Sequence, residues 1–259
     1  MIWRFGVIGH PIKHSLSPRL HEAALRSIGF EGDSHALDVP LSDSSRISSL
    51  MVVHNALSVT MPLKEAAIKA CDEIDAVAKR TRSVNSMLRK EGRVFGRSTD
   101  GAGFLDALKE VGVDVTGLSA VVQGSGGSAR AIVDALASAG VASVAVLARD
   151  QAAAVTLCAD YKVAVANPSE FEHVGLIVNT VPVGTGPSEV PTSAMTWSTN
   201  PTAVDVVYEP RESDWLAAHR AEGRQTFNGL GMLVHQAHIQ VEWWLDHPID
   251  VEALWAAVL

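Results

Sequence analysis

A glycine-rich turn between an apolar strand and a helix is the feature that most constrains the fold of this chain. The turn reads QGSGGSA over Gln123–Ala129, so Gly124, Gly126 and Ala129 satisfy the pattern G-x-G-x-x-A. These small residues permit a tight turn and a close approach of the backbone to a pyrophosphate, which then lies at the helix N-terminus. The competing interpretation is a tight strand-to-helix turn without a ligand. The position of the motif, after a strand and before a helix, favours dinucleotide binding.

The segments around this motif alternate between strands and helices. The strands are almost continuously apolar, which is typical of a parallel sheet covered by helices on both faces. The predicted strands are Ser119–Gln123, Ser143–Ala148, Leu176–Asn179, Ala203–Val207 and Gln225–Phe227, and the predicted helices are Ser128–Ala139 and Gln151–Ala159. We therefore predict a Rossmann-type dinucleotide-binding domain.

The first hundred residues form a second α/β unit. The predicted strands are Arg4–Ile8, Ser34–Val39, Ala56–Thr60, Val84–Arg89 and Arg93–Gly96, and the helices are Pro18–Ile28, Ser42–Leu50, Lys64–Ala70 and Glu73–Arg80. A helix over Ala102–Val111 marks the domain boundary. After Gly229, the amphipathic helices Met232–Leu245 and Val251–Val258 have no strand left to cover, so we expect them to pack on the N-terminal domain. The predicted domains are residues 1–103 plus 230–259, and residues 104–229.

Composition excludes several classes of protein. Of the 259 residues, 47% are hydrophobic and 19% are charged, which describes a soluble globular chain. The net charge of −8, without a Lys/Arg block, argues against nucleic-acid binding. Cys71 and Cys158 lack metal-ligand spacing and are predicted to be buried free thiols of a cytosolic protein, with no metal site. We expect neither a signal peptide nor a membrane span.

Hydroxyl groups cluster where the first strand meets its helix. Ser17 is predicted to be the N-cap of the helix, and Pro18 its first residue. The free N–H groups of the first turn, with the hydroxyls of Ser15 and Ser17, then suit an anion the size of a carboxylate. The alternative is a helix cap without a ligand.

Further polar residues follow the ends of other strands. Thr60 and Lys64 come after one strand, and Asp100 comes after another, although each also has a plain structural interpretation. Asn85 lies among apolar neighbours, so its amide needs partners, which a polyol ligand could supply. Arg149 and Asp150 stand where a Rossmann domain contacts the ribose: Arg favours a 2′-phosphate and an acidic residue favours a 2′-hydroxyl. Asp150 is free to cap the next helix if Arg149 faces the ribose.

Taken together, these motifs resemble the shikimate dehydrogenases from end to end. The motifs occur in the family's order: GHPIKHSLSP from Gly9, SVTMPLK to Lys64, Val84–Asn85, Thr99–Gly101, the turn from Gly124, Tyr208–Pro210, and GLGMLVHQ to Gln236. The family usually has Asn where this chain has Ser58 and Ser98, and these replacements are expected to loosen hydrogen bonding near the site.

The resemblance implies NADP-dependent reduction of 3-dehydroshikimate to shikimate in chorismate biosynthesis, in the cytoplasm, by a monomer or homodimer. It implies an N-terminal substrate-binding and catalytic domain and an NADP-binding domain. The implied catalytic residues are Lys64 and Asp100; the implied substrate-binding residues are Ser15, Ser17, Thr60, Asn85, Tyr208 and Gln236; and the implied cofactor-binding residues are Gly124, Ser125, Gly126, Gly127, Ser128, Arg149 and Gly229.

Two alternatives stay open. The first is an NAD-dependent quinate/shikimate dehydrogenase, which Asp150 favours and Arg149 disfavours. The second is a non-catalytic paralogue that binds shikimate or quinate without turnover. The presence of both Lys64 and Asp100 speaks against this second alternative.

Overall fold

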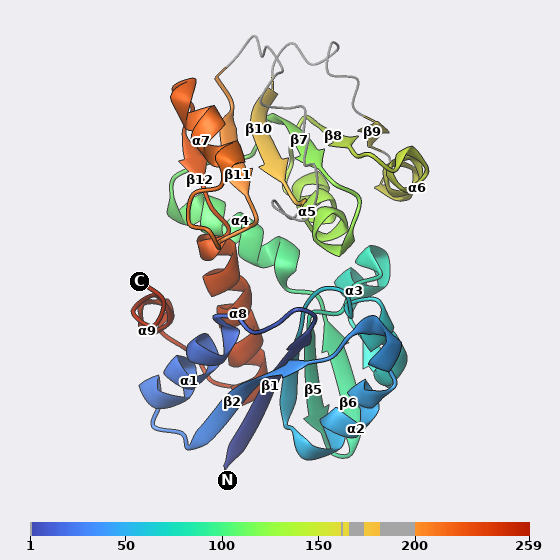
Figure 1. Cartoon of the computed structure of the whole chain (residues 1–259), viewed down its shortest axis with the longest axis vertical. Helices are drawn as coiled ribbons and strands as arrows, with labels where there is room; N and C mark the ends of the chain where they lie inside the picture. The colour runs from blue at the N-terminus through green and yellow to red at the C-terminus, as the bar shows by residue number, and fades with distance from the viewer. Residues whose placement is uncertain (1, 162, 166–173, 182–199) are drawn as a thin grey trace. The chain divides into compact units, whose positions relative to one another are not determined.

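The computed structural model describes residues 2–161, 163–165, 174–181 and 200–259. The chain forms two compact α/β units, one of Met1–Gly103 with Leu233–Leu259 and one of Phe104–Met232 (Figure 1). The division falls within two helices, α4 (Asp100–Glu110) and α8 (Leu230–Leu245).

The first unit is built on a mixed six-stranded sheet in the order β2-β1-β3-β5-β6-β4. Its strands are β1 (Trp3–Gly9), β2 (Gly32–Asp38), β3 (Ala56–Val59), β4 (Glu73–Ile74), β5 (Ser86–Lys90) and β6 (Arg93–Arg97). β1 is parallel to β2 and β3, whereas β5 is antiparallel to both β3 and β6. Glu91 and Gly92 join β5 to β6 with φ values of 54° and 76°, as a tight hairpin requires.

The helices of the first unit depart from the predictions for Ser42–Leu50, which is divided into a 3₁₀ turn and an α-helix, for Lys64–Ala70, which is a shorter 3₁₀ helix, for Glu73–Arg80, and for Val251–Val258, which ends at Trp255. The observed elements are α1 (Ser17–Ser27), a 3₁₀ turn at Leu41–Asp43, α2 (Arg46–Val53), a 3₁₀ helix at Ala66–Ala70, α3 (Ala76–Thr81) and α9 (Val251–Trp255). The predicted helix over Glu73–Arg80 is wrong at its start because Glu73 and Ile74 pair with β6. Asp75 then caps α3, since its carboxylate accepts a 2.6 Å hydrogen bond from the N–H of Ala78.

The C-terminal helices pack on the first unit, as predicted. Trp244 of α8 lies 4.9 Å from Phe5 of β1 and 5.0 Å from His21 of α1, measured between ring centroids. Its indole N–H donates to the Ser86 hydroxyl at 2.9 Å. α8 therefore forms part of the core of this unit.

The second unit is a parallel six-stranded sheet in the order β12-β11-β10-β7-β8-β9. The strands are β7 (Ser119–Gln123), β8 (Ser143–Leu147), β9 (Ala164–Val165), β10 (Val174–Asn179), β11 (Thr202–Asp205) and β12 (Thr226–Phe227). The predicted Rossmann-type arrangement is confirmed. The direction of strand addition reverses between β7 and β10, which is where open α/β sheets bind ligands.

Helices α5 (Gly127–Ser138) and α6 (Gln151–Tyr161) follow β7 and β8, close to the predicted bounds. The sequence analysis missed β9, a two-residue edge strand, and α7 (Asp214–Ala221). A local signal for α7 was present, because Ser213 caps it by accepting from the N–H of Leu216 at 3.2 Å. Within the described part of the chain, no helix is long and apolar enough to cross a membrane.

Candidate functional site

Strand direction explains why several polar residues meet at one edge of the first sheet. β5 is antiparallel to β3, so the start of β5 lies beside the carboxyl end of β3, and the Val59 N–H donates to the Asn85 carbonyl at 2.8 Å. The Asn85 N–H in turn donates to the carbonyl of Arg97, the last residue of β6, at 3.0 Å. Asn85 is thus fixed beside the segment that leads into α4.

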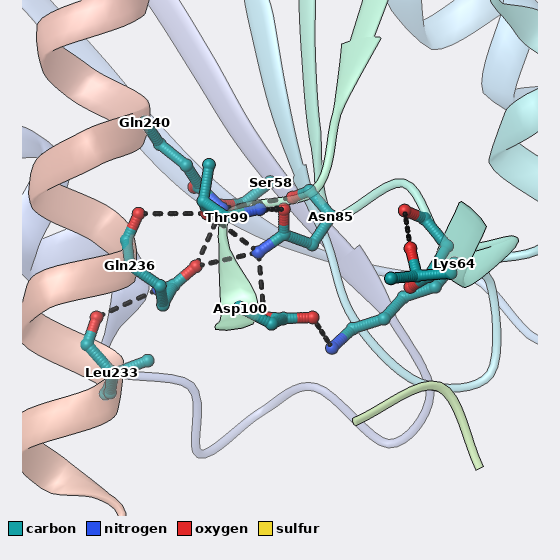
Figure 2. A network of polar contacts seen from close by, with 10 residues as sticks. Ser58, Lys64, Asn85, Thr99, Asp100, Leu233, Gln236 and Gln240 are labelled. Atoms are coloured by element: carbon teal, nitrogen blue, oxygen red, sulfur yellow. Dashed lines mark hydrogen bonds and ion pairs between the residues drawn. The ribbon is translucent and has the colours of Figure 1, made fainter. Parts of the chain in front are cut away.

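Lys64 and Asp100 form an ion pair at this edge (Figure 2). The ammonium of Lys64 lies 2.6 Å from Oδ2 of Asp100, and the two side chains are 15% and 6% exposed. Lys64 lies in a turn before the 3₁₀ helix, and its carbonyl accepts from the Val84 N–H at 2.9 Å. Asp100 is the first residue of α4. An ammonium held against a largely buried carboxylate, with limited access to water, is a suitable proton donor to an oxygen that gains negative charge.

Asn85 orients the second oxygen of Asp100. Its Nδ2 donates to Oδ1 of Asp100 at 2.8 Å and to the Thr99 hydroxyl at 2.9 Å. Its Oδ1 accepts from the Thr99 N–H at 2.8 Å, and this backbone donor fixes which way the amide faces. The amide of Asn85 was predicted to need partners, and its partners here are protein groups.

Gln236 joins the same network from α8. Its Nε2 donates to the Leu233 carbonyl at 2.9 Å, which leaves Oε1 directed at Nδ2 of Asn85, 3.2 Å away. A Cβ atom on Gly103 would lie 2.4 Å from the backbone nitrogen of Gln236. Only glycine at position 103 therefore lets α4 come this close to α8.

The network includes three further residues that the sequence analysis missed: Gln240, His21 and Ser34. Gln240 donates to Oε1 of Gln236 at 2.7 Å, and its own Oε1 accepts from the Ser58 hydroxyl. His21 lies 3.5 Å from that hydroxyl and 2.8 Å from Oγ of Ser34. Burial lowers the pKa of His21 to about 3, so its ring is neutral near pH 7. One signal was available for Gln240, because it lies four residues after Gln236 on the same helix face.

The two serines that replace the family's usual asparagines behave differently. Ser58 is buried, and its hydroxyl donates a hydrogen bond to Oε1 of Gln240. Ser98 is buried, and its hydroxyl has no hydrogen-bond partner within the described residues.

The predicted cap of α1 is wrong. The helix begins at Ser17 itself, and Leu16, which has no side-chain capping hydrogen bond, takes the N-cap position. The hydroxyl of Ser15 accepts from the Ser17 N–H at 3.3 Å instead. The segment before α1 is tied to the segment after β3, where Thr60 lies, because the N–H of His10 donates to the Met61 carbonyl at 3.0 Å.

In the second unit, the glycine-rich turn lies at the carboxyl end of β7. Gly124 has a φ of +110°, and a Cβ there would lie 2.3 Å from the hydroxyl of Thr180. Gly126 is the N-cap of α5, and a Cβ on it would meet no heavy atom of the described residues within 4 Å. Among the described residues, the turn, which includes Ser125, Gly127 and Ser128, thus leaves space over a helix N-terminus, as an anionic group requires.

The predicted cap by Asp150 is present at the start of α6, after β8. The Asp150 carboxylate accepts from the N–H of Ala153 at 2.9 Å and so caps α6. Arg149 is exposed. The acidic side chain is therefore committed to the helix terminus, where the helix dipole also stabilises it.

Tyr208 and Gly229 lie in the part of the second unit that follows β11. Tyr208 is half-buried. A Cβ on Gly229 would lie 1.9 Å from the carbonyl oxygen of Val206, so the chain passes too close there for any side chain. The nearby Asp205 was missed by the sequence analysis; it binds Asn179 and Ser213, and burial raises its pKa.

The described residues contain no group of three or more His, Cys, Asp or Glu side chains able to hold a metal ion. Cys71 and Cys158 are both free; Cys158 is buried as predicted, whereas Cys71 is only partly buried. Burial raises the pKa of Cys71 to about 12, which leaves it unreactive as a thiolate near pH 7.

Comparison with known proteins identifies the family. Residues 7–87 match the family model described as the shikimate dehydrogenase substrate binding domain, and residues 229–259 match the one described as the shikimate 5′-dehydrogenase C-terminal domain. The NADP(+) shikimate dehydrogenase of Symbiobacterium thermophilum is 37% identical, over 95% of this chain and 90% of its own length. That of Thermus thermophilus is also 37% identical, over 93% and 92%.

A solved structure of a Thermus thermophilus shikimate 5-dehydrogenase, in complex with NADP(H) and shikimate, superposes with a TM-score of 0.89. It is 34% identical, and the match covers 98% of each chain. At this identity and coverage, the chain belongs to the shikimate dehydrogenase family.

Proposed function

We propose that this enzyme catalyses the reversible, NADP-dependent reduction of 3-dehydroshikimate to shikimate, a step in the biosynthesis of chorismate and the aromatic amino acids. The observation that carries the proposal is the ion pair of Lys64 and Asp100, set in a buried amide network at the carboxyl edge of the first sheet. Relatives of known name supply the identity of the substrate and the cofactor.

Lys64 supplies the proton in the proposed reaction. When the carbonyl carbon of 3-dehydroshikimate accepts a hydride, its oxygen becomes an alkoxide, and a nearby ammonium both stabilises that charge and donates a proton. Asp100 holds Lys64 in place by the 2.6 Å contact and, as a hydrogen-bond acceptor, orients a substrate hydroxyl. In the oxidative direction the same pair removes the proton from the hydroxyl of shikimate.

Residues of the first unit are proposed to bind the substrate. Ser15 and Ser17, at the start of α1, would bind the substrate carboxylate through their hydroxyls and free N–H groups. Thr60, Asn85 and Gln236 would contact the ring hydroxyls. Tyr208, in the second unit, is proposed as a further substrate-binding residue by family resemblance. On this assignment residues 1–103 plus 230–259 form the substrate-binding and catalytic domain, and residues 104–229 the NADP-binding domain.

The residues of the second unit fit NADP, which supplies the hydride when it is bound. The space that the described residues leave over Gly126, at the N-terminus of α5, suits a pyrophosphate, and Gly124 to Ser128 provide backbone N–H groups there. Arg149 would bind the 2′-phosphate, since its planar guanidinium can donate to two phosphate oxygens. Asp150, committed to the cap of α6, does not oppose that phosphate. Gly229 is assigned to the cofactor by resemblance. A cytoplasmic location and a monomeric or homodimeric state stay predictions of the sequence.

A steady-state assay that crosses NADP and NAD with shikimate and quinate tests this function. The expected result is the highest kcat/KM with NADP and shikimate. Higher kcat/KM with NAD would favour the quinate/shikimate alternative. Absence of turnover with every pair, in a folded protein, would favour the non-catalytic binding protein.

A further inference from the structure

We propose that Gln240 is a positioning residue of this enzyme, which keeps the amide of Asn85 directed at Asp100 by satisfying the oxygen of Gln236. The inference rests on the proposed function for its kinetic consequences. Gln240 is 1% exposed and lies on α8, one turn beyond Gln236.

The orientation of each amide in the network is fixed by a backbone group. Asn85 accepts from the Thr99 N–H, Gln236 donates to the Leu233 carbonyl, and Gln240 donates to the Asn85 carbonyl at 3.1 Å. No amide can rotate by half a turn without losing such a bond. The oxygen of Gln236 must therefore face both the nitrogen of Asn85 and the nitrogen of Gln240 (Figure 2).

The hydrogen-bond lengths show how the donors are shared. Nδ2 of Asn85 has two hydrogens but three acceptors nearby: Asp100 at 2.8 Å, the Thr99 hydroxyl at 2.9 Å and Gln236 at 3.2 Å. The longest of the three contacts is the one to Gln236, whose oxygen already receives the 2.7 Å bond from Gln240. Without that bond, the oxygen of Gln236 would compete with Asp100 for the hydrogens of Asn85.

The other acceptors of Gln240 do not depend on it. The Asn85 carbonyl already accepts from the Val59 N–H at 2.8 Å. The Thr99 hydroxyl, 3.3 Å from Nε2 of Gln240, has closer partners in Nδ2 of Asn85 and the Gln236 carbonyl. Loss of the donor at position 240 thus mainly leaves the oxygen of Gln236 without its 2.7 Å hydrogen bond. Through Asn85, the change then reaches the Asp100 carboxylate that holds Lys64.

Ser58 fixes Gln240 from the other side. Its hydroxyl donates to Oε1 of Gln240, although Ser58 on β3 and Gln240 are 182 residues apart in sequence. This contact holds the amide of Gln240 with its nitrogen toward the site. Ser58 is thus the second member of the positioning pair.

The test compares Gln240→Met, which keeps the side-chain length but removes the donor, with Trp244→Phe. Trp244 lies one turn further along α8 and also makes a buried hydrogen bond, to Ser86, outside the network of Asp100. In shikimate oxidation, Gln240→Met should lower kcat about 10- to 100-fold because the reacting groups are displaced. Its KM for NADP should change less than about twofold. Trp244→Phe should keep kcat within about twofold of the wild type, even if it lowers the Tm as much as Gln240→Met does.

Ser58→Ala keeps the amide donor of Gln240 but removes the hydrogen bond that holds its Oε1. The kcat of this variant should therefore lie between that of the wild type and that of Gln240→Met. A kcat of Gln240→Met within about twofold of Trp244→Phe would overturn the proposal. Absence of shikimate turnover in the wild type would instead defeat the proposed function.

Nitrogen-15 NMR of the Asn85 side-chain amide tests the positioning itself, without reliance on activity. Its hydrogens should exchange slowly with solvent in the wild type and in Trp244→Phe, and its resonances should shift, with faster exchange, in Gln240→Met. Unchanged Asn85 resonances in Gln240→Met would refute the proposal whatever the enzyme catalyses.

Discussion

The carboxyl edges of the two sheets are built in opposite ways. At the edge of the first sheet, side chains such as Asn85, Asp100 and Gln236 bind one another, and these hydrogen bonds fix their orientations. At the edge of the second sheet, Gly124 allows a tight turn beside Thr180, and a Cβ on Gly126, at the N-terminus of α5, would meet no atom of the described residues. A network of side chains loses its geometry when one partner is removed. A binding site made of backbone N–H groups is instead blocked when a glycine gains a side chain, and its affinity falls when a nearby charged residue such as Arg149 is lost.

This difference suits the two tasks that we propose. A proton donor must stand within hydrogen-bond reach of the reacting oxygen, so its neighbours have to hold it in one position. A pyrophosphate is bound by several N–H groups whose positions follow from the strand, the turn and the helix. The first task therefore depends on side chains from distant parts of the sequence, and the second depends on one short segment.

Removal of Lys64 should have the largest effect. Lys64→Ala is expected to lower kcat about 10²- to 10⁴-fold, since the alkoxide loses its proton donor. The Kd of NADP, measured by fluorescence titration, should stay within about twofold because the proposed cofactor residues lie in the other unit. Lys69→Ala, at an exposed lysine of the following 3₁₀ helix, is the matched control. If kcat fell less than about tenfold, Lys64 would not be the proton donor.

Removal of Arg149 tests the cofactor edge. Arg149→Ala should raise the KM of NADP roughly 10- to 100-fold, the loss expected for hydrogen bonds to a charged group. The KM of NAD, which lacks the 2′-phosphate, should change little and serves as the internal control. Equal losses with both cofactors would contradict the assignment of Arg149.

The two serines before and at the start of α1 test the proposed carboxylate site. The double substitution of Ser15 and Ser17 by alanine should raise the KM of shikimate about tenfold while kcat changes less than about threefold, because ground state and transition state share this contact. Ser27→Ala, at the other end of α1, provides the control. An unchanged KM in the double variant would count against the anion site.

The buried histidines give the smallest effect, on stability against pH. The pKa of His21 is lowered to about 3 and that of His219, in the second unit, to about 4, in both cases mainly by burial. Between these values and the unfolded pKa near 6.5 the unfolded chain binds more protons, so stability falls as the pH drops below about 6.5.

For His21, this loss should reach about 1.4 kcal/mol by pH 5.5. Urea unfolding of the wild type and of His21→Gln at pH 7.0, 6.0 and 5.5 measures it. The variant should show a shallower pH dependence of the free energy of unfolding, whatever its stability at pH 7.0. Identical slopes would mean that His21 is not held neutral in the folded state.

The sequence predicted the longer strands of both units and missed one two-residue edge strand in each, β4 in the first and β9 in the second. In the second unit the predicted strands are present because parallel strands buried on both faces have a continuous apolar signal. In the first unit, the helix predicted over Glu73–Arg80 overlooked the edge strand β4, whose pairing with β6 has no local signature. Ser17 is of a residue type that often caps helices, yet it is the first helical residue, and Leu16 takes the N-cap position.

The sequence by itself determined the strands and most helices, the glycine-rich turn, the cap at Asp150 and the family, because each of these depends on short-range sterics, local hydrogen bonds or the order of motifs. Only the tertiary structure decided that Gln240 reaches Ser58 and that Gln236 reaches Asn85, which are 182 and 151 residues apart. A hydrogen bond requires its atoms within about 3.5 Å. No local pattern encodes that distance for residues so far apart in the chain; it follows from the packing of α8 against the sheet.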